Sequence, residues 1–113
     1  MRVVVIGGGP AGIMASIKAS QKAQVTLIEK NNDMGKKLLI TGKGRCNITN
    51  NIDISEHIKN IPCNGNFMYS SLYSFTNEDL IKFFNDNGLQ TKVERGQRVF
   101  PVSDKSVDVL NTL

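Results

Sequence analysis

Six consecutive residues near the N-terminus have the types and spacing of a phosphate-binding turn. They are Gly7, Gly8, Gly9, Pro10, Ala11 and Gly12. The run fits the pattern G-x-G-x-x-G and directly follows the apolar segment Arg2–Ile6. In such a turn the first glycine permits a tight bend, the second lets the backbone approach a pyrophosphate, and the third allows a helix to pack closely on a strand. The pattern therefore predicts a dinucleotide site in which phosphates lie at a helix N-terminus.

An acidic residue further along supports this prediction. Glu29 lies 17 residues after Gly12, at the end of a second apolar segment. A carboxylate at that place can accept hydrogen bonds from both hydroxyls of an adenosine ribose. Its negative charge also disfavours NADP, because a 2′-phosphate would be repelled in a partly buried site. The adjacent cation, Lys30, keeps NADP open as an alternative and joins the candidate cofactor contacts.

The net charge is concentrated in one short segment. The chain has 113 residues and a net charge of +4. Residues 34–52 contain Lys36, Lys37, Lys43 and Arg45 and no acid, so the other ten cations and ten acids of the chain cancel. A nucleic-acid surface usually spreads its basic residues along a face. The distribution therefore predicts a local anion site and no nucleic-acid partner.

The elements that position these residues can be predicted from hydrophobic periodicity. Arg2–Ile6 and Val25–Glu29 have the continuous apolar character of strands buried on both faces of a parallel sheet. A helix from the glycine turn to about Ser20 would connect them as a βαβ unit. Residues 30–66 show little periodicity and are predicted to be mostly loop, with a helical turn around Ser55–Ile61.

The C-terminal half carries clearer local signals. A helix is predicted over Asn77–Asn87, with a capping box formed by Thr76 and Asp79 and a stop at Gly88. Strands Thr91–Glu94 and Gln97–Val102 would form a hairpin. The remaining expectations are a short helix or turn over Phe67–Phe75 that buries its aromatic side chains, and a last helix capped by Ser103 with Val107, Leu110 and Leu113 on one face.

A second motif occupies Thr41–Asn50, with the sequence TGKGRCNITN. Together with the glycine turn and the segment Arg98–Pro101, this run resembles the N-terminal part of a family of NAD(P)/FAD-dependent oxidoreductases, the flavoproteins described as aminoacetone-oxidase-like or bile-acid-pathway-reductase-like. The resemblance covers essentially the entire chain. It implies an α/β, Rossmann-like FAD-binding βαβ unit with an inserted helix and β-hairpin, in which the Thr41–Asn50 run follows the dinucleotide toward the flavin.

The resemblance and the residue chemistry together define the expected cofactor contacts. Glycines free the backbone to approach a ligand, Arg45 can bind a phosphate or a flavin carbonyl, and Asn47 can both donate and accept. The full set is Gly7, Gly9, Pro10, Ala11, Gly12, Glu29, Lys30, Lys36, Lys37, Thr41, Gly42, Gly44, Arg45, Cys46 and Asn47. Cys46 is expected to pack beside the cofactor without redox chemistry, because Cys63 is too distant in sequence for a C-x-x-C pair.

Family members are several times longer than this chain, so it is interpreted as an N-terminal portion. Residues 1–50 would hold the dinucleotide-binding unit and flavin loop, and residues 51–113 a helical and hairpin segment whose partner is the remainder of its own chain. The whole protein would be an FAD-dependent oxidoreductase of a small-molecule substrate, with NAD(P)H a candidate electron donor, and this portion alone would be inactive. An amine-type oxidase and a reductase of an enone-like substrate both stay open.

Two rival functions also stay open, an NAD(P)-binding dehydrogenase domain and a non-catalytic nucleotide-binding module. Zinc is not expected, because the two cysteines are far apart and the single histidine, His57, has no companion ligand. The N-terminal apolar run is too short for a signal-peptide core or a membrane span. A cytoplasmic protein without membrane contact is therefore predicted, with both thiols reduced.

Overall fold

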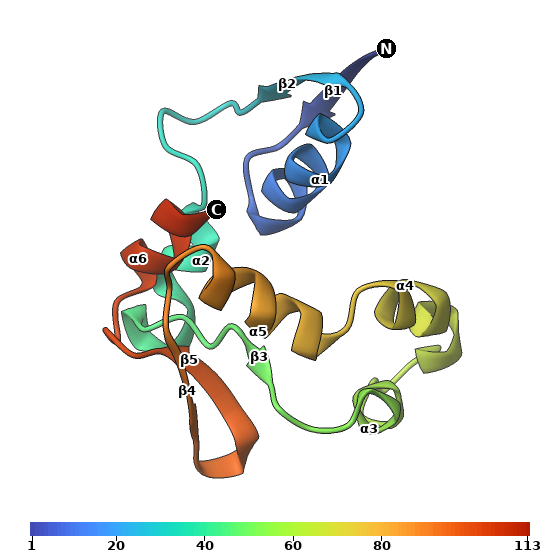
Figure 1. Cartoon of the computed structure of the whole chain (residues 1–113), viewed down its shortest axis with the longest axis vertical. Helices are drawn as coiled ribbons and strands as arrows, with labels where there is room; N and C mark the ends of the chain where they lie inside the picture. The colour runs from blue at the N-terminus through green and yellow to red at the C-terminus, as the bar shows by residue number, and fades with distance from the viewer.

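The first 29 residues form a strand–helix–strand unit. In the computed structural model, which describes all residues 1–113, β1 (Arg2–Ile6) and β2 (Gln24–Ile28) pair in parallel from Arg2 opposite Gln24 to Ile6 opposite Ile28. Helix α1 (Pro10–Ser20) connects them and packs on the sheet. This unit lies at the top of Figure 1, beside the rest of the chain. The predicted βαβ unit is confirmed.

The prediction that both strands are buried on both faces is wrong for this chain. Side chains alternate along β1 and β2 between partly buried and exposed positions. Val4, Ile6 and Ile28 are 60%, 85% and 51% exposed. The physical reason is that α1 covers one face of a sheet of only two strands, and no element covers the other.

Residues 30–66 contain more regular structure than their composition indicates. The elements are α2 (Lys36–Ile40), a 3-10 turn (Thr41–Gly44), β3 (Thr49–Asn50) and α3 (Ile54–Lys59). Helix α3 confirms the predicted helical turn. Helix α2 was not predicted, because five residues are too few to show a helical period.

The predicted capped helix and hairpin are both present. Helix α5 (Asn77–Asp86) begins with a full capping box, in which the Asp79 N–H donates to Thr76 Oγ1 (3.1 Å) and the Thr76 N–H donates to Asp79 Oδ2 (2.9 Å). Strands β4 (Thr91–Glu94) and β5 (Arg98–Pro101) pair antiparallel around a tight 3-10 turn. β3 pairs with the other edge of β5, which gives the strand order β3-β5-β4.

The aromatic side chains of residues 67–75 are exposed, which corrects the prediction that they are buried. A 3-10 turn (Gly65–Met68) leads into α4 (Tyr69–Ser74). Phe67, Tyr69 and Tyr73 are 85%, 54% and 44% exposed, and the two tyrosine rings stack at 4.4 Å between centroids. Helix α4 packs mainly against the preceding 3-10 turn and α3, at the edge of the molecule, so no core covers these rings.

The last helix begins later than expected. Helix α6 (Ser106–Thr112) follows Lys105, so Ser103 does not cap it, and the fully buried valine is Val109 and not Val107. The start of α6 is fixed by a contact that sequence reasoning did not anticipate, the hydrogen bond that Ser106 Oγ donates to Leu39 O at 2.8 Å. This bond joins α6 to α2.

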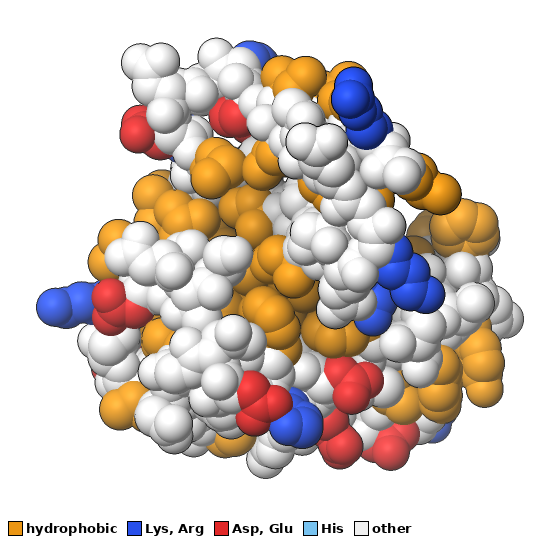
Figure 2. Space-filling model, turned by 45° about the horizontal axis from the view of Figure 1, so that its top comes forward, with side chains coloured by type: hydrophobic (Ala, Val, Ile, Leu, Met, Phe, Trp, Pro, Cys, Tyr) orange, Lys and Arg blue, Asp and Glu red, His pale blue; other side chains and the backbone are white.

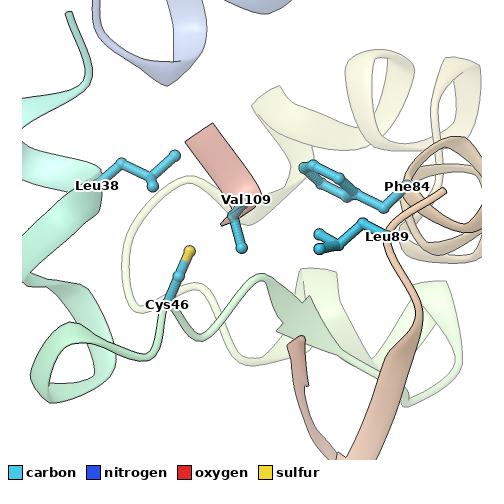
Figure 3. Close-up of a cluster of buried hydrophobic side chains, with 5 residues drawn as sticks. All are labelled: Leu38, Cys46, Phe84, Leu89 and Val109. Atoms are coloured by element: carbon cyan, nitrogen blue, oxygen red, sulfur yellow. The ribbon is translucent and has the colours of Figure 1, made fainter. Parts of the chain in front are cut away.

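The hydrophobic core lies in the second part of the chain, outside the βαβ unit. Figure 3 shows the five buried side chains that form it, Leu38, Cys46, Phe84, Leu89 and Val109. In this order, they come from α2, the loop after α2, α5, the loop between α5 and β4, and α6. Cys46 packs in this core and is 5% exposed. The core therefore holds the Thr41–Asn50 run against three helices.

Candidate cofactor-binding site

The glycine turn presents unused backbone donors at the start of α1. The Gly7 N–H donates to Ile28 O (2.7 Å) and the Gly8 N–H to Glu29 Oε2 (2.6 Å), while the first bond of the helix runs from the Ile13 N–H to Gly9 O. The N–H groups of Gly9, Ala11 and Gly12 have no acceptor within the chain. Free donors at the positive end of a helix suit the oxygens of a diphosphate.

The glycines of the turn differ in what a side chain would meet. A Cβ on Gly12 would lie 1.8 Å from Gly7 O, so α1 packs against the turn too closely for any other residue. A Cβ on Gly9 would meet nothing within 4 Å, so the space in front of it is open to a ligand. Gly7 has a φ of +103°, which favours glycine. These contacts match the three tasks that the G-x-G-x-x-G pattern predicts.

Glu29 is partly occupied by donors from its own chain. Besides the Gly8 N–H, it accepts at Oε1 from the Asn31 N–H (2.9 Å) and from Asn31 Nδ2 (2.7 Å). The Asn31 and Gly8 donors lower the pKa of Glu29 and keep it ionised. A carboxylate has about four acceptor directions, so about one is left for a ribose hydroxyl unless Asn31 moves. Asn31 was missed, although an amide two residues after an acid is a donor within its reach.

The loop Thr41–Asn47 folds tightly on itself. Gly42, Lys43, Gly44 and Cys46 all have positive φ, between 55° and 84°. The Cys46 N–H donates to Thr41 O (3.0 Å), and a Cβ on Gly42 would lie 2.9 Å from the Asn47 nitrogen. The Asn47 side-chain amide donates to Thr49 O (3.0 Å) and Val99 O (3.3 Å). The glycines are thus required by the fold of the loop itself.

The side chain of Arg45 is engaged by two carboxylates. Its Nη2 lies 2.5 Å from Glu94 Oε1 and 2.6 Å from Asp104 Oδ1, and its Nε donates to the same Asp104 oxygen at 2.9 Å. The guanidinium carbon lies 4.1 Å from the centroid of the Phe100 ring. Lys92 Nζ lies 2.7 Å from Asp104 Oδ2 and 3.4 Å from Glu94 Oε1. We call these four charged residues the Arg45 network.

The charges of the network shift one another. Hydrogen bonds to Glu94 and then Asp104 raise the pKa of Arg45, and the bond from Arg45 lowers the pKa of Glu94. The pKa of Asp104 is lowered by Lys92 first and Arg45 second. The two cations and two carboxylates of the Arg45 network give it no net charge. The positive charge of Arg45, which the sequence of residues 34–52 leaves unbalanced, is therefore balanced by acids from elsewhere in the chain. Neither Glu94 nor Asp104 was predicted, and no local pattern marks them as partners of Arg45.

One cavity brings residues of the turn and of the loop together. It has a volume of about 520 Å³ and lies between α1 on one side and α2, the loop, α5 and α6 on the other. Figure 2 shows apolar side chains gathered in a hollow across this face. The predicted cofactor contacts on its wall are Pro10, Ala11, Lys37, Thr41, Cys46 and Asn47. The other wall residues are apolar, among them Leu38 and Phe84.

The remaining nine predicted contacts do not line this cavity. They are Gly7, Gly9, Gly12, Glu29, Lys30, Lys36, Gly42, Gly44 and Arg45. Lys36 faces a second groove beside α1 and α6, and Lys30 is exposed next to Glu29. Arg45, Gly42 and Gly44 belong to the loop but do not line the cavity. The turn is tied to the start of α2 by the Gly35 N–H, which donates to Gly8 O at 2.8 Å.

Two further observations concern other kinds of site. No three His, Cys, Asp or Glu side chains of the chain gather closely enough to hold a metal ion, and His57 Nε2 lies 3.0 Å from Asn50 O. None of the helices has both the length and the apolar character needed to cross a membrane.

Comparison with known proteins identifies the family. The HI0933-like protein Rossmann domain matches residues 1–113. The chain is 40% identical over 116 residues to the 3-dehydro-bile acid delta(4,6)-reductase of Clostridium scindens. This alignment covers 99% of the chain and 27% of the relative. The chain is 35% and 30% identical to ribosomal RNA dihydrouridine synthases of Escherichia coli and Haemophilus influenzae, each over 76% of this chain and 21% of the relative.

The chain therefore spans about a quarter of the length of these relatives. The match over all 113 residues confirms both the Rossmann-type α/β fold and the resemblance drawn from the glycine turn and the Thr41–Asn50 run. The chain belongs to the HI0933-like Rossmann-domain family, which groups it with bile-acid-reductase-like flavoprotein oxidoreductases.

Proposed function

We propose that the protein carrying this chain is an FAD-dependent oxidoreductase, and that residues 1–113 bind FAD through the Gly7–Gly12 turn, Glu29 and the Thr41–Asn47 loop. The observation that carries the proposal is the cavity. Pro10 and Ala11 of the turn and Thr41, Cys46 and Asn47 of the loop are distant in sequence and line it together. An apolar cavity with a few polar groups at its edge is typical of a cofactor site.

Each part of the site has a distinct task in this proposal. The free N–H groups of Gly9, Ala11 and Gly12 would bind the diphosphate, and Glu29 would accept from the adenosine ribose. Thr41, Cys46 and Asn47 would border the flavin end, where the apolar wall excludes water. The flavin supplies hydride chemistry when bound, and the chain supplies binding and orientation.

The names of the relatives favour the reductive direction. One relative is called a reductase, and the others are named for making a dihydro product. We therefore propose reduction of an unsaturated small molecule, with NADH or NADPH as the electron donor. The relative with the higher identity and the fuller coverage of this chain is the one named for a small-molecule substrate. We also propose a cytoplasmic location, in which the thiols of Cys46 and Cys63 would stay reduced.

The test is an absorbance spectrum of the purified protein that carries this sequence, followed by anaerobic addition of NADH or NADPH. Visible flavin bands that bleach on addition are the expected result. Bands that bleach only with an amine substrate would support the oxidase direction instead. A colourless protein that binds NAD and cannot be reconstituted with FAD would refute the proposal in favour of a nicotinamide dehydrogenase, and binding of a nucleotide with no redox change would favour a non-catalytic module.

A further inference from the structure

The Thr41–Asn47 loop has a backbone conformation that must be held by its surroundings. Gly42, Lys43 and Gly44 are consecutive residues with positive φ, and Cys46 follows with a φ of +61°. Two of the four are not glycine, and a left-handed conformation is costly for residues with a side chain. Strain of this kind persists only where other contacts over-determine the structure. The loop therefore needs an anchor.

Arg45 lies inside this strained run and carries the strongest contacts of the loop. Its guanidinium makes hydrogen bonds to Glu94, at the end of β4, and to Asp104, in the turn before α6. One face of the guanidinium lies on the Phe100 ring of β5. Planar, forked contacts of this type fix direction as well as distance. The loop is thus attached to the hairpin and to the approach to α6.

The same contacts direct Arg45 away from a ligand in the cavity. Nε and Nη2 are already used, the Arg45 network is neutral, and the side chain is absent from the cavity wall. The next residue, Cys46, does line the cavity and is also part of the core. Movement of Arg45 would therefore move a wall residue.

We infer that Arg45 is a positioning residue, which holds the loop in its cofactor-binding conformation through Glu94 and Asp104 and does not itself bind the phosphates or the flavin. This inference rests on the proposed FAD function of the loop. It identifies Glu94 and Asp104 as parts of the site although neither touches the cavity.

The Glu94→Gln/Asp104→Asn double variant distinguishes positioning from direct contact, because only the positioning role predicts weaker FAD binding. If Arg45 binds the cofactor, loss of two nearby negative charges leaves FAD binding unchanged or makes it tighter. If Arg45 positions the loop, the FAD dissociation constant rises by about tenfold, because a neutral amide oxygen holds the guanidinium less strongly than a carboxylate does, by about the difference between a charged and a neutral hydrogen bond. Asp86→Asn, which breaks the exposed ion pair with Lys82 on α5, is the matched control and leaves the constant unchanged.

A second readout needs no cofactor. Cys46 is buried and Cys63 exposed, so the rate of alkylation at Cys46, mapped by mass spectrometry in the FAD-free protein, reports loop opening, with Cys63 as internal reference. We expect alkylation at Cys46 to rise by about tenfold in the double variant, because the neutral amide acceptors hold Arg45 less strongly than the carboxylates do. Arg45→Lys should show the same rise, since an ammonium group cannot reproduce the fork.

The outcomes separate this inference from the proposed function. Wild-type protein that does not bind FAD defeats the proposed function, while the alkylation of Cys46 still tests the anchoring by Arg45. Unchanged or tighter FAD binding in the double variant, with Cys46 still protected, overturns the positioning role. Should the double variant fail to fold by circular dichroism, Glu94→Gln alone removes one charged acceptor and keeps both bonds to Asp104, and the same two readouts apply.

Discussion

Two glycines of the same turn should respond to alanine in opposite ways. In Gly12→Ala the new Cβ would lie 1.8 Å from Gly7 O and 3.0 Å from the Gly7 carbonyl carbon. Ordinary contacts begin near 3.4 Å, so α1 or the turn must shift by more than 1 Å. In Gly9→Ala the Cβ would meet nothing within 4 Å, and the backbone, with φ −79° and ψ 176°, suits any residue.

The magnitudes follow from these distances. Overpacking against a backbone atom costs about 3 kcal/mol, and the better helix propensity of alanine returns about 1 kcal/mol, so Gly12→Ala should destabilise the protein by about 2 kcal/mol. Gly9 is the N-cap of α1, where alanine is a poorer cap, so Gly9→Ala should cost only about 0.5 kcal/mol. Gly9→Ala should instead weaken FAD, because its methyl group fills the space that the diphosphate needs.

The assay is urea unfolding followed by circular dichroism, alongside FAD titration by flavin fluorescence. We expect a lower unfolding midpoint for Gly12→Ala. For Gly9→Ala we expect a midpoint close to wild type and an FAD dissociation constant raised by about tenfold or more, the equivalent of one or two lost phosphate contacts. Wild-type FAD affinity in a folded Gly9→Ala variant would refute the diphosphate position, and an unchanged midpoint for Gly12→Ala would refute the close packing of α1 on the turn.

Further predictions concern the core, a helix cap, the acid and the two thiols. Phe84→Ala should destabilise the protein by about 3 to 4 kcal/mol in urea unfolding, because Phe84 is only 3% exposed at the centre of the core. Thr76→Ala should cost about 1 kcal/mol by the same method, through loss of the capping box. The pKa of Glu29 is lowered in the folded state, so its contribution to folding and to FAD binding is full at neutral pH and is lost only as pH falls below the usual glutamate range. Glu29→Gln should weaken FAD binding at pH 7. In titrations across pH, the variant should also lack the loss of FAD affinity that the wild-type protein shows in acid. Burial raises the pKa of Cys46, so iodoacetamide at pH 8 should modify Cys63 well before Cys46 in wild-type protein, and equal rates would contradict the buried position.

Features encoded by neighbouring residues were predictable from the sequence. The glycine turn, the capping box of α5 and the hairpin of β4 and β5 each depend on contacts within a few residues, and all three are present. The position of Glu29 was predictable because a βαβ unit brings the end of β2 beside the turn. Local signals therefore identified most of the residues now proposed to bind FAD.

Contacts between distant segments were not predictable. Arg45 meets Glu94 and Asp104, which are 49 and 59 residues further along the chain, and neither acid belongs to a recognisable motif. The start of α6 depends on Ser106 reaching Leu39, which is equally remote. Burial was misjudged for β1 and α4 because apolar composition indicates that a side chain can be covered, and the chain folds without an element that covers it.

The placement of the cavity has a consequence for thermal stability. Its wall combines α1, from the βαβ unit, with α2, α5 and α6, from the part that contains the core. A ligand that fills the cavity contacts both the βαβ unit and the part that contains the core. Its binding free energy therefore adds to the free energy of unfolding of the protein. By mass action this contribution is about 2.7 kcal/mol when free ligand is at about 100 times its dissociation constant. The melting temperature of the protein should therefore rise with the concentration of free FAD.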